Sequence, residues 1–274
     1  MENLVWIVCI LFVVLLLYGY VLNYFLKIEY YEIISDKIRE DTIIVLLTDL
    51  HGCEHGRENS RLLKKIDGIS PSFICIAGDM TVKNGKKTES VLSFLHQLSE
   101  RYPIYYAPGN HEIRMPEYDD YRDRLREMGI HYLENQSARA GNNICIAGLD
   151  LPEYWYHKCW HRRMYSVEKT EEQLGHCQKG MFTIMLAHNP EYFPWYAEWG
   201  ADLILSGHIH GGIARLPFLG GVLSPSLRLF PRYDAGQFEH KGKYMVLSRG
   251  LGLHHIKFRF FNIPEISAIK IRKC

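Results

Sequence analysis

Five short apolar runs, each followed within three residues by an aspartate, asparagine or histidine, constrain the fold of this 274-residue chain more than any other feature. They contain no charge, which is typical of strands buried on both faces of a sheet. Stretches with helical periodicity lie between several of them, and this alternation predicts a layered α/β architecture. The runs are Ile43–Leu47, Phe73–Ala77, Ile104–Ala107, Phe182–Leu186 and Leu203–Leu205; further strand candidates are Ile144–Ala147, Tyr244–Leu247 and Ile266–Ile271; the helical stretches are Glu58–Ile69, Thr88–Arg101 and Glu117–Met128.

Each of the five runs leads into residues that can bind a metal ion. The carboxyl ends of strands in α/β sheets meet at one edge, where ligands gather, so these residues are expected to converge. His208 and His210 are two residues apart, and in an extended backbone both rings can reach one site. The segments after the runs are Asp49-Leu50-His51, Gly78-Asp79, Gly109-Asn110-His111-Glu112, Ala187-His188 and Gly207-His208-Ile209-His210.

The residue types in these segments fit one kind of chemistry. Carboxylate, imidazole and amide groups together suit Mn²⁺, Fe or Zn²⁺, without the thiolates of a structural zinc site. Two divalent ions about 3.5 to 4 Å apart can clamp a phosphoryl group and generate hydroxide from water at neutral pH. The formal net charge of +1 gives no electrostatic reason to expect nucleic acid as a partner.

In this order the motifs resemble the calcineurin-like metallophosphoesterase superfamily, over about residues 43–271. The resemblance implies a four-layered α/β/β/α sandwich with its site at the carboxyl edge of the strands. The apolar N-terminus, Gly211-Gly212, and the segments 248–252 and 264–266 are similar to the bacterial membrane-associated phosphodiesterase branch of that superfamily, which includes proteins similar to anchored UDP-2,3-diacylglucosamine hydrolases.

The resemblance also implies roles for individual residues. Two divalent ions would be bound, most readily Mn²⁺, with Fe, Zn²⁺ or Mg²⁺ as alternatives, and hydroxide bridging them would attack phosphorus. His111 would donate a proton to a phosphoryl oxygen or to the leaving oxygen, and Glu112 would either orient His111 or fix the local turn. One ion would bind Asp49, His51 and His210, the other Asn110, His188 and His208, with Asp79 between them.

The N-terminus predicts a membrane anchor. Residues 4–22 form an apolar run without charge, and at 1.5 Å per residue such a run nearly spans a hydrocarbon core of about 30 Å. It lacks the basic start and small-residue cleavage site of a signal peptide. We therefore expect a single transmembrane anchor over residues 1–26, a charged linker over 27–42 and one phosphoesterase domain over 43–274. The protein is then expected to cross the cell membrane once. The basic residues Lys27, Lys37 and Arg39 follow the apolar run, which favours a catalytic domain on the cytoplasmic side.

Other features allow a functional and a structural interpretation. The aromatic and basic segment Leu151–Tyr165 could be a lid or docking face for a phosphate-bearing lipid, or a loop packed on its own aromatics. Asp150 is interpreted as part of a turn and His254-His255 as non-ligands. His55, near the first ligands, is either a substrate contact or, as we favour, a solvated loop histidine. Candidates for gripping a substrate phosphate, which could equally be structural, are Arg114, Arg215 and Arg249.

These observations predict a membrane-anchored dimetal phosphodiesterase or pyrophosphatase, with a lipid-linked phosphate ester as one class of substrate. Two alternatives stay open: a general phosphatase for soluble nucleotides or phosphoproteins, and a non-catalytic metal-binding scaffold. The presence of both Asp79 and His111 argues against the scaffold, because loss of either would be expected in a protein that had lost turnover.

Overall fold

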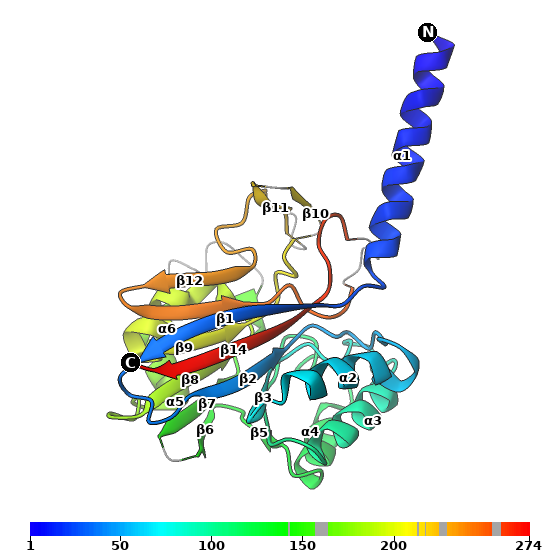
Figure 1. Ribbon diagram of the computed structural model, residues 1–274. Helices are drawn as coiled ribbons and strands as arrows, with labels where there is room; N and C mark the ends of the chain where they lie inside the picture. Colours follow the sequence, from blue (N-terminus) through cyan, green and yellow to red (C-terminus); the bar gives the residue numbers. More distant parts are fainter. Residues whose placement is uncertain (142, 157–163, 213, 217, 225–228, 254–258) are drawn as a thin grey trace.

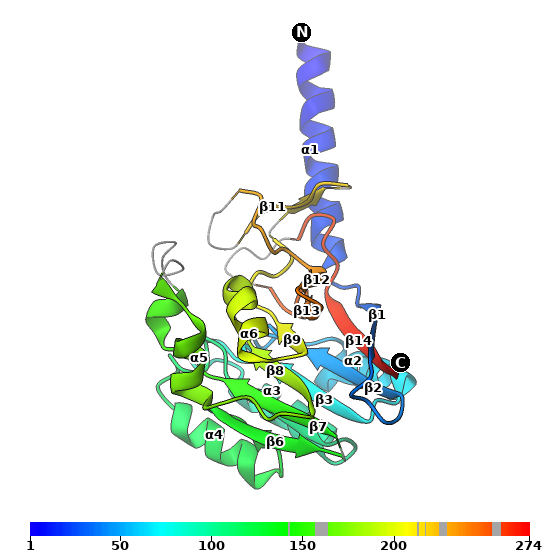
Figure 2. The same cartoon turned by 90° about the vertical axis from the view of Figure 1, so that its left-hand side faces the viewer.

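The computed structural model describes residues 1–141, 143–156, 164–212, 214–216, 218–224, 229–253 and 259–274. Within these residues, two six-stranded sheets lie face to face, and helices cover their outer faces (Figures 1 and 2). This is the four-layered α/β/β/α arrangement that the family resemblance implied.

The first sheet has the strand order β1-β14-β2-β3-β4-β5. Strands β2 to β5 are parallel to one another, whereas β14 runs antiparallel to β2 and parallel to β1. Helices α2, α3 and α4 cover its outer face (Figure 1). The bounds are β1 Lys27–Ser35, β2 Thr42–Leu47, β3 Phe73–Ala77, β4 Ile104–Ala107, β5 His131–Tyr132, β14 Glu265–Lys273, α2 Ser60–Ile69, α3 Thr88–Ser99 and α4 Tyr118–Glu127.

The second sheet has the order β12-β13-β9-β8-β7-β6, with antiparallel strands at both edges and parallel strands between them. Helices α5 and α6 cover its outer face (Figure 2). A short hairpin, β10–β11, lies outside both sheets. The bounds are β6 Gln136–Ala140, β7 Ile144–Leu149, β8 Phe182–Ala187, β9 Leu203–Ser206, β10 Ala214–Leu216, β11 Gly220–Leu223, β12 Gly236–His240, β13 Lys243–Leu247, α5 Val167–Leu174 and α6 Phe193–Trp199.

The sandwich explains why the central strands are apolar without interruption. In β3, Phe73, Cys75 and Ala77 face the second sheet, whereas Ile74 and Ile76 face the helices. Successive side chains of a strand point to opposite faces, so a strand covered on both sides must be apolar at every position. The predicted strands therefore match the structure to within one or two residues.

The prediction of a linker over residues 27–42 is wrong for its first nine residues. Lys27–Ser35 forms β1, which pairs with β14 along its whole length. Its sequence, KIEYYEIIS, contains charged residues, because β1 is the outermost strand of its sheet among the described residues and buries only Ile33 within its own bounds. A strand covered on one side lacks the continuous apolar run by which the central strands were found.

Helix α1, Glu2–Leu22, projects from the domain, which it contacts near its C-terminal end (Figure 1). Within Asn3–Leu22, the most apolar 18-residue window has a mean hydropathy of 2.8 and only 6% of it is buried, so α1 is a candidate membrane span. Asn23–Leu26 then leads directly into β1.

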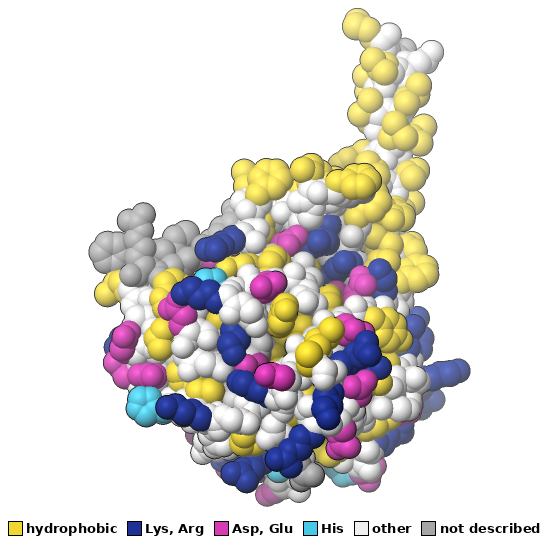
Figure 3. Space-filling view, turned by 60° about the vertical axis from the view of Figure 1, so that its left-hand side comes forward, with side chains coloured by type: hydrophobic (Ala, Val, Ile, Leu, Met, Phe, Trp, Pro, Cys, Tyr) yellow, Lys and Arg dark blue, Asp and Glu magenta, His cyan; other side chains and the backbone are white. Residues whose placement is uncertain are grey.

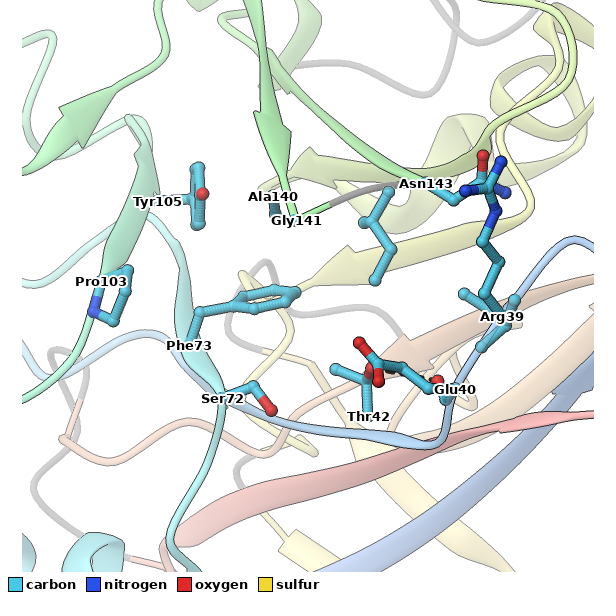
Figure 4. A pocket seen from close by; sticks show the side chains of 12 residues that line it. Arg39, Glu40, Thr42, Ser72, Phe73, Pro103, Tyr105, Ala140, Gly141 and Asn143 are labelled. Atoms are coloured by element: carbon cyan, nitrogen blue, oxygen red, sulfur yellow. Dashed lines mark hydrogen bonds between the residues drawn. The ribbon is translucent and has the colours of Figure 1, made fainter.

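Strand pairing places the foot of α1 beside the carboxyl edge of the first sheet. Lys27, at the start of β1, pairs with Glu265, and Ser267 in turn pairs with Leu46, one residue before the end of β2. At the opposite edge, where β2, β3 and β4 begin, a cavity of about 380 Å³ is lined by residues that include Arg39, Phe73 and Tyr105 (Figure 4). That cavity is remote from the predicted metal ligands.

Candidate functional site

Buried histidines and aspartates from separate loops converge at the carboxyl edge of the sheets. Within the described part of the chain they form overlapping groups, and in each group the potential ligand atoms lie within 4.8 Å of one another. The strands that deliver these loops are β2, β3, β4, β8 and β9. The groups are Asp49 with His51 and His210, Asp79 with His51 and His111, and Asp79 with His188 and His208.

The first group surrounds one point. The Nε2 atoms of His51 and His210 are 3.1 Å apart, and His210 Nε2 lies 3.2 Å from Asp49 Oδ1. His51 Nδ1 lies 3.3 Å from the carbonyl oxygen of Thr81, and a carbonyl can only accept, so the neutral His51 ring carries its proton on Nδ1. Its Nε2 lone pair is thereby directed toward His210 and Asp49, as a metal ligand requires.

The group of Asp79, His188 and His208 has the same design. His188 Nδ1 donates to the carbonyl oxygen of Ala77 over 2.6 Å, which leaves Nε2 facing Asp79 Oδ2 at 3.0 Å. The ring of His208 meets that of His188 edge to face, with centroids 5.1 Å apart. The backbone N–H of His208 donates to both carboxylate oxygens of Asp49, at 3.2 and 3.1 Å, and so ties the two groups together.

Asn110 lies in the same cluster of loops, next to His111, whose backbone N–H donates to Asp79 Oδ1 over 2.8 Å. Asn110 is 5% exposed, and its Oδ1 is buried without a hydrogen-bond partner among the described residues. The Nε2 atom of His188 is likewise buried, and it lies in an ion-pair contact with Asp79 Oδ2 at 3.0 Å. A buried amide oxygen without a donor, beside buried imidazoles and carboxylates, fits a cation, so this set of side chains suits a pair of divalent ions.

The electrostatics of the group also favour a cation. Burial raises the pKa of Asp49 to about 7, an effect that His188 partly offsets. Burial raises the pKa of Asp79 as well, but His188, His111 and His51 outweigh it and hold that pKa well below its usual range. For His188, burial lowers the pKa, whereas Asp79 and Asp49 outweigh burial and raise it to about 9. A bound divalent ion would replace the proton that these groups otherwise share.

His111 and Glu112 follow Asn110 but have different surroundings. His111 Nδ1 accepts a hydrogen bond from the backbone N–H of Lys83 over 3.3 Å, so the neutral ring carries its proton on Nε2. The Glu112 carboxylate accepts from the backbone N–H groups of Asp79, Thr81 and Gly109, at 2.7, 3.1 and 2.9 Å. Glu112 therefore fixes the two loops after β3 and β4 against each other, which is one of the two roles expected for it.

One glycine allows the loops after β2 and β9 to approach each other. A Cβ atom on Gly207 would lie 2.2 Å from Thr48 Oγ1 and 2.3 Å from Asp49 Oδ2, closer than any side chain permits. The tight fit brings the His208 N–H within reach of Asp49. The glycine beside the His-x-His pair is thus explained by packing.

The arginines proposed as phosphate ligands are each paired with a carboxylate. Arg114 contacts Glu153 at 2.9 Å, and Arg215 contacts Asp234 at 2.9 Å. Arg249 lies between Glu29 and Glu265, at 3.3 and 3.4 Å. These ion pairs support the structural alternative, and a substrate phosphate would have to share or displace a carboxylate.

Sequence reasoning did not single out Tyr156 or Arg259 near the site, and its favoured interpretation of His55 was wrong. Tyr156 places its ring 5.2 Å from that of His208, and its hydroxyl is buried without a hydrogen-bond partner among the described residues. Arg259, 3% exposed, donates to the carbonyl oxygen of Gly250 over 3.3 Å and to that of Gly252. His55 was expected to be solvated, but it is 3% exposed and its Nε2 lies 2.9 Å from the carbonyl oxygen of Leu251.

Tyr156 and His55 could not be placed from local pattern, because their partners His208 and Leu251 lie far away in the sequence, whereas Arg259 contacts a loop only seven to nine residues before it. Arg259 and His55 both contact the loop over 250–252, whose Gly252 N–H donates to Asp49 O over 2.6 Å. Asp150 follows β7 as expected and belongs to none of the groups of potential metal ligands. The pair His254-His255 and all of the basic residues of the segment Leu151–Tyr165 lie outside the described residues.

Comparison with known proteins agrees with this geometry. The model of the calcineurin-like phosphoesterase family matches residues 42–212. An uncharacterized metallophosphoesterase of Aquifex aeolicus is 28% identical over 261 residues, covering 93% of this chain and 95% of the relative. An uncharacterized metallophosphoesterase of Campylobacter jejuni is 30% identical, covering 86% of this chain and 60% of the relative.

A transmembrane protein with a metallophosphoesterase domain from Danio rerio is 28% identical over 84% of this chain, which spans about half, 53%, of that relative. The family match begins at β2 and ends just after the His-x-His pair, so it contains all of the clustered histidines and aspartates. The chain therefore belongs to the calcineurin-like phosphoesterase family and is a metal-dependent phosphoesterase.

Proposed function

We propose that this protein is a membrane-anchored dimetal phosphodiesterase or pyrophosphatase that acts on a phosphate ester at the bilayer surface. The observation that carries the proposal is the position of Asp79, which is shared by two of the ligand groups and is buried between histidines of different loops. A carboxylate in that position can offset the repulsion between two cations.

The proposed ligands divide between the two ions as the groups do. Asp49, His51 and His210, which form one group, would hold one ion. His188 and His208, which form another group with Asp79, would hold the other ion together with Asn110, whose Oδ1 is buried without a hydrogen-bond partner among the described residues, and Asp79 would contact both ions. Two such ions, for which we propose Mn²⁺, neutralise charge on a phosphoryl group and lower the pKa of bound water to about 7.

His111 is proposed as the proton donor. Because its Nδ1 accepts from Lys83, its Nε2–H is the group that can donate to a phosphoryl oxygen or to the leaving oxygen. The His111 ring packs against the ring of His51, with centroids 4.6 Å apart, which holds it beside the first group. A donor positioned in this way contributes about 10²- to 10⁴-fold to a rate.

Membrane attachment is supported by α1 and by the description of the zebrafish relative as a transmembrane protein. We further propose that the domain lies on the cytoplasmic side, because Lys27, Lys37 and Arg39 follow the apolar helix. A bound phosphate ester would then meet the metal ligands at the edge of the domain nearest the foot of α1.

The test uses the full chain in detergent. Bound metal is measured by mass spectrometry, and hydrolysis of bis-(p-nitrophenyl) phosphate is followed with added Mn²⁺. Asp79→Ala should lose both metal and activity, whereas His111→Ala should keep its metal and lose about 10²- to 10⁴-fold in rate. Asp119→Ala and His176→Ala are matched controls, since their side chains are 80% and 88% exposed.

Wild-type protein that holds two metal ions and hydrolyses no phosphate ester would contradict the proposal and favour a scaffold. Equal rates on phosphate monoesters and diesters would instead favour a general phosphatase. Comparison of lipid-linked phosphate esters with soluble nucleotides then identifies the class of substrate.

A further inference from the structure

Large apolar side chains are exposed on the hairpin β10–β11 and on the segments beside it. Their exposed fractions run from 40% for Leu216 to 107% for Phe218, which lies in the turn of the hairpin. Figure 3 shows yellow side chains gathered along this end of the domain, next to α1. We call this set the hairpin surface, and it consists of Leu216, Phe218, Leu219, Leu229, Phe230 and Phe261.

The hairpin surface is held by the fold. The N–H of Arg215 in β10 donates to the carbonyl oxygen of Phe260 over 2.9 Å, and the N–H of Phe230 donates to that of Val222 in β11 over 2.9 Å. The ion pair of Arg215 with Asp234 secures the base of the hairpin. Exposed apolar residues on a structured element of this kind mark an interaction site.

The contacts of α1 show what this surface faces. The ring of Tyr18 lies 5.4 Å from that of Phe261 and 6.4 Å from that of Phe260. Tyr18 belongs to the candidate span Asn3–Leu22 and precedes its end by four residues, which is about 6 Å along a helix axis. Phe261 therefore lies level with the last turn of the span, and both ribbon views place β10 and β11 level with the lower part of α1 (Figures 1 and 2).

We propose that the hairpin surface enters the interfacial layer of the bilayer that α1 spans and turns the catalytic edge of the domain toward the lipid headgroups. Strand β10 begins two residues after Gly212, close behind His208 and His210, so the surface and the metal-binding loop are continuous in the chain. The inference rests on the membrane insertion of α1 in the proposed function. It extends that function by specifying phosphate esters within the headgroup layer as the substrate class.

The test is quenching of tryptophan fluorescence by brominated lipid, with the full chain reconstituted in phosphatidylcholine vesicles. Phe218→Trp adds an emitter at the turn of the hairpin, and the signal of the parent chain, with its five tryptophans, is subtracted. Ile34→Trp is the matched control: Ile34 is 55% exposed and lies in β1 seven residues after Lys27, about 23 Å from the start of that strand.

The added emission of Phe218→Trp should fall at least about twofold in brominated vesicles, since lipid-buried indole is quenched on contact, while that of Ile34→Trp stays unchanged. Equal emission of Phe218→Trp in brominated and ordinary vesicles would overturn the proposal. A spectral shift that depends on protein density and is indifferent to bromine would overturn it in favour of a second copy of the chain covering the surface.

A second measurement separates this inference from the proposed function. The double substitution Phe218→Ser with Leu219→Ser should lower the rate on a phosphate ester carried in vesicles by about tenfold and leave the rate on soluble bis-(p-nitrophenyl) phosphate unchanged. Equal losses on both substrates would contradict a membrane role for the surface. Absence of turnover in the parent chain would refute the proposed function, while the quenching result would still decide the inference.

Discussion

At the scale of single residues, the site is built in a conformation that side chains normally avoid. Asp49, His51, Asp79, His208 and His210 all have φ between 49° and 73°. The left-handed region costs a non-glycine residue roughly 1 to 2 kcal/mol. Hydrogen bonds such as that from the His51 N–H to the carbonyl oxygen of Asp79 hold these residues there. Strained backbone conformations are concentrated at functional sites, because function there requires a particular side-chain position even at a cost in backbone conformational energy.

A substitution at His210 should expose this strain. In metal-free protein, His210→Gly should be more stable than His210→Ala by about 1 kcal/mol, because glycine adopts positive φ without cost. Denaturant unfolding in the presence of a chelator gives both free energies of unfolding. At His188, which is outside the positive-φ set, alanine should instead be the more stable choice. The same order at both positions would show that the backbone strain is not significant.

A second prediction concerns Asp150. Burial, and to a lesser extent the charge of Glu134, raises the pKa of the Asp150 carboxyl to about 6 in the folded protein. The folded protein then binds more protons than the unfolded chain between about pH 4 and pH 6, so the stability of the wild type falls as pH rises through that window. Asp150→Asn removes this cost. We expect it to raise the free energy of unfolding above pH 6, by at most about 3 kcal/mol, and to have little effect near pH 4. A gain that is independent of pH would contradict this explanation.

At the scale of elements, β1 joins the candidate span to the domain. It pairs with β14 over nine residues and buries Ile33, and Lys37 just beyond it contacts Asp202 at 2.8 Å. The sheet therefore begins directly after α1, and the phosphoesterase domain includes residues that precede the family match.

Two truncations test the role of β1. A chain of residues 27–274 retains the strand and should unfold cooperatively, whereas a chain of residues 42–274 exposes the edge of β14 and the side of the core that Ile33 covers. We expect the shorter chain to melt at least about 8 °C lower, or to aggregate. Circular dichroism during heating measures this difference, and equal melting temperatures would show that β1 is dispensable.

At the scale of the whole molecule, the sequence predicted the features that depend on local pattern. Central strands such as β3 are apolar on both faces, and an aspartate, asparagine or histidine follows each of them within a few residues. Because these strands are parallel, the side chains that follow them converge at one edge of the sheet. The metal-binding groups were predictable for that reason, although their role as ligands stays a prediction.

Features set by distant partners could not be predicted. Arg249 is paired with Glu29 across 220 positions of sequence, and β1 meets β14 from the opposite end of the chain. The packing of Tyr18 on Phe261 is of the same kind, because neither residue carries a signal for the other. Sequence pattern gives the layers and the reactive residues, whereas the surroundings of those residues need the folded chain.

The four residues between α1 and β1 have a kinetic consequence. With so short a tether, Asn23–Leu26, the membrane anchoring that we propose would keep the metal-binding edge of the domain beside the bilayer. Encounters with a membrane-resident substrate would then occur by lateral diffusion, and turnover should scale with substrate molecules per unit area of membrane and not per unit volume of solution.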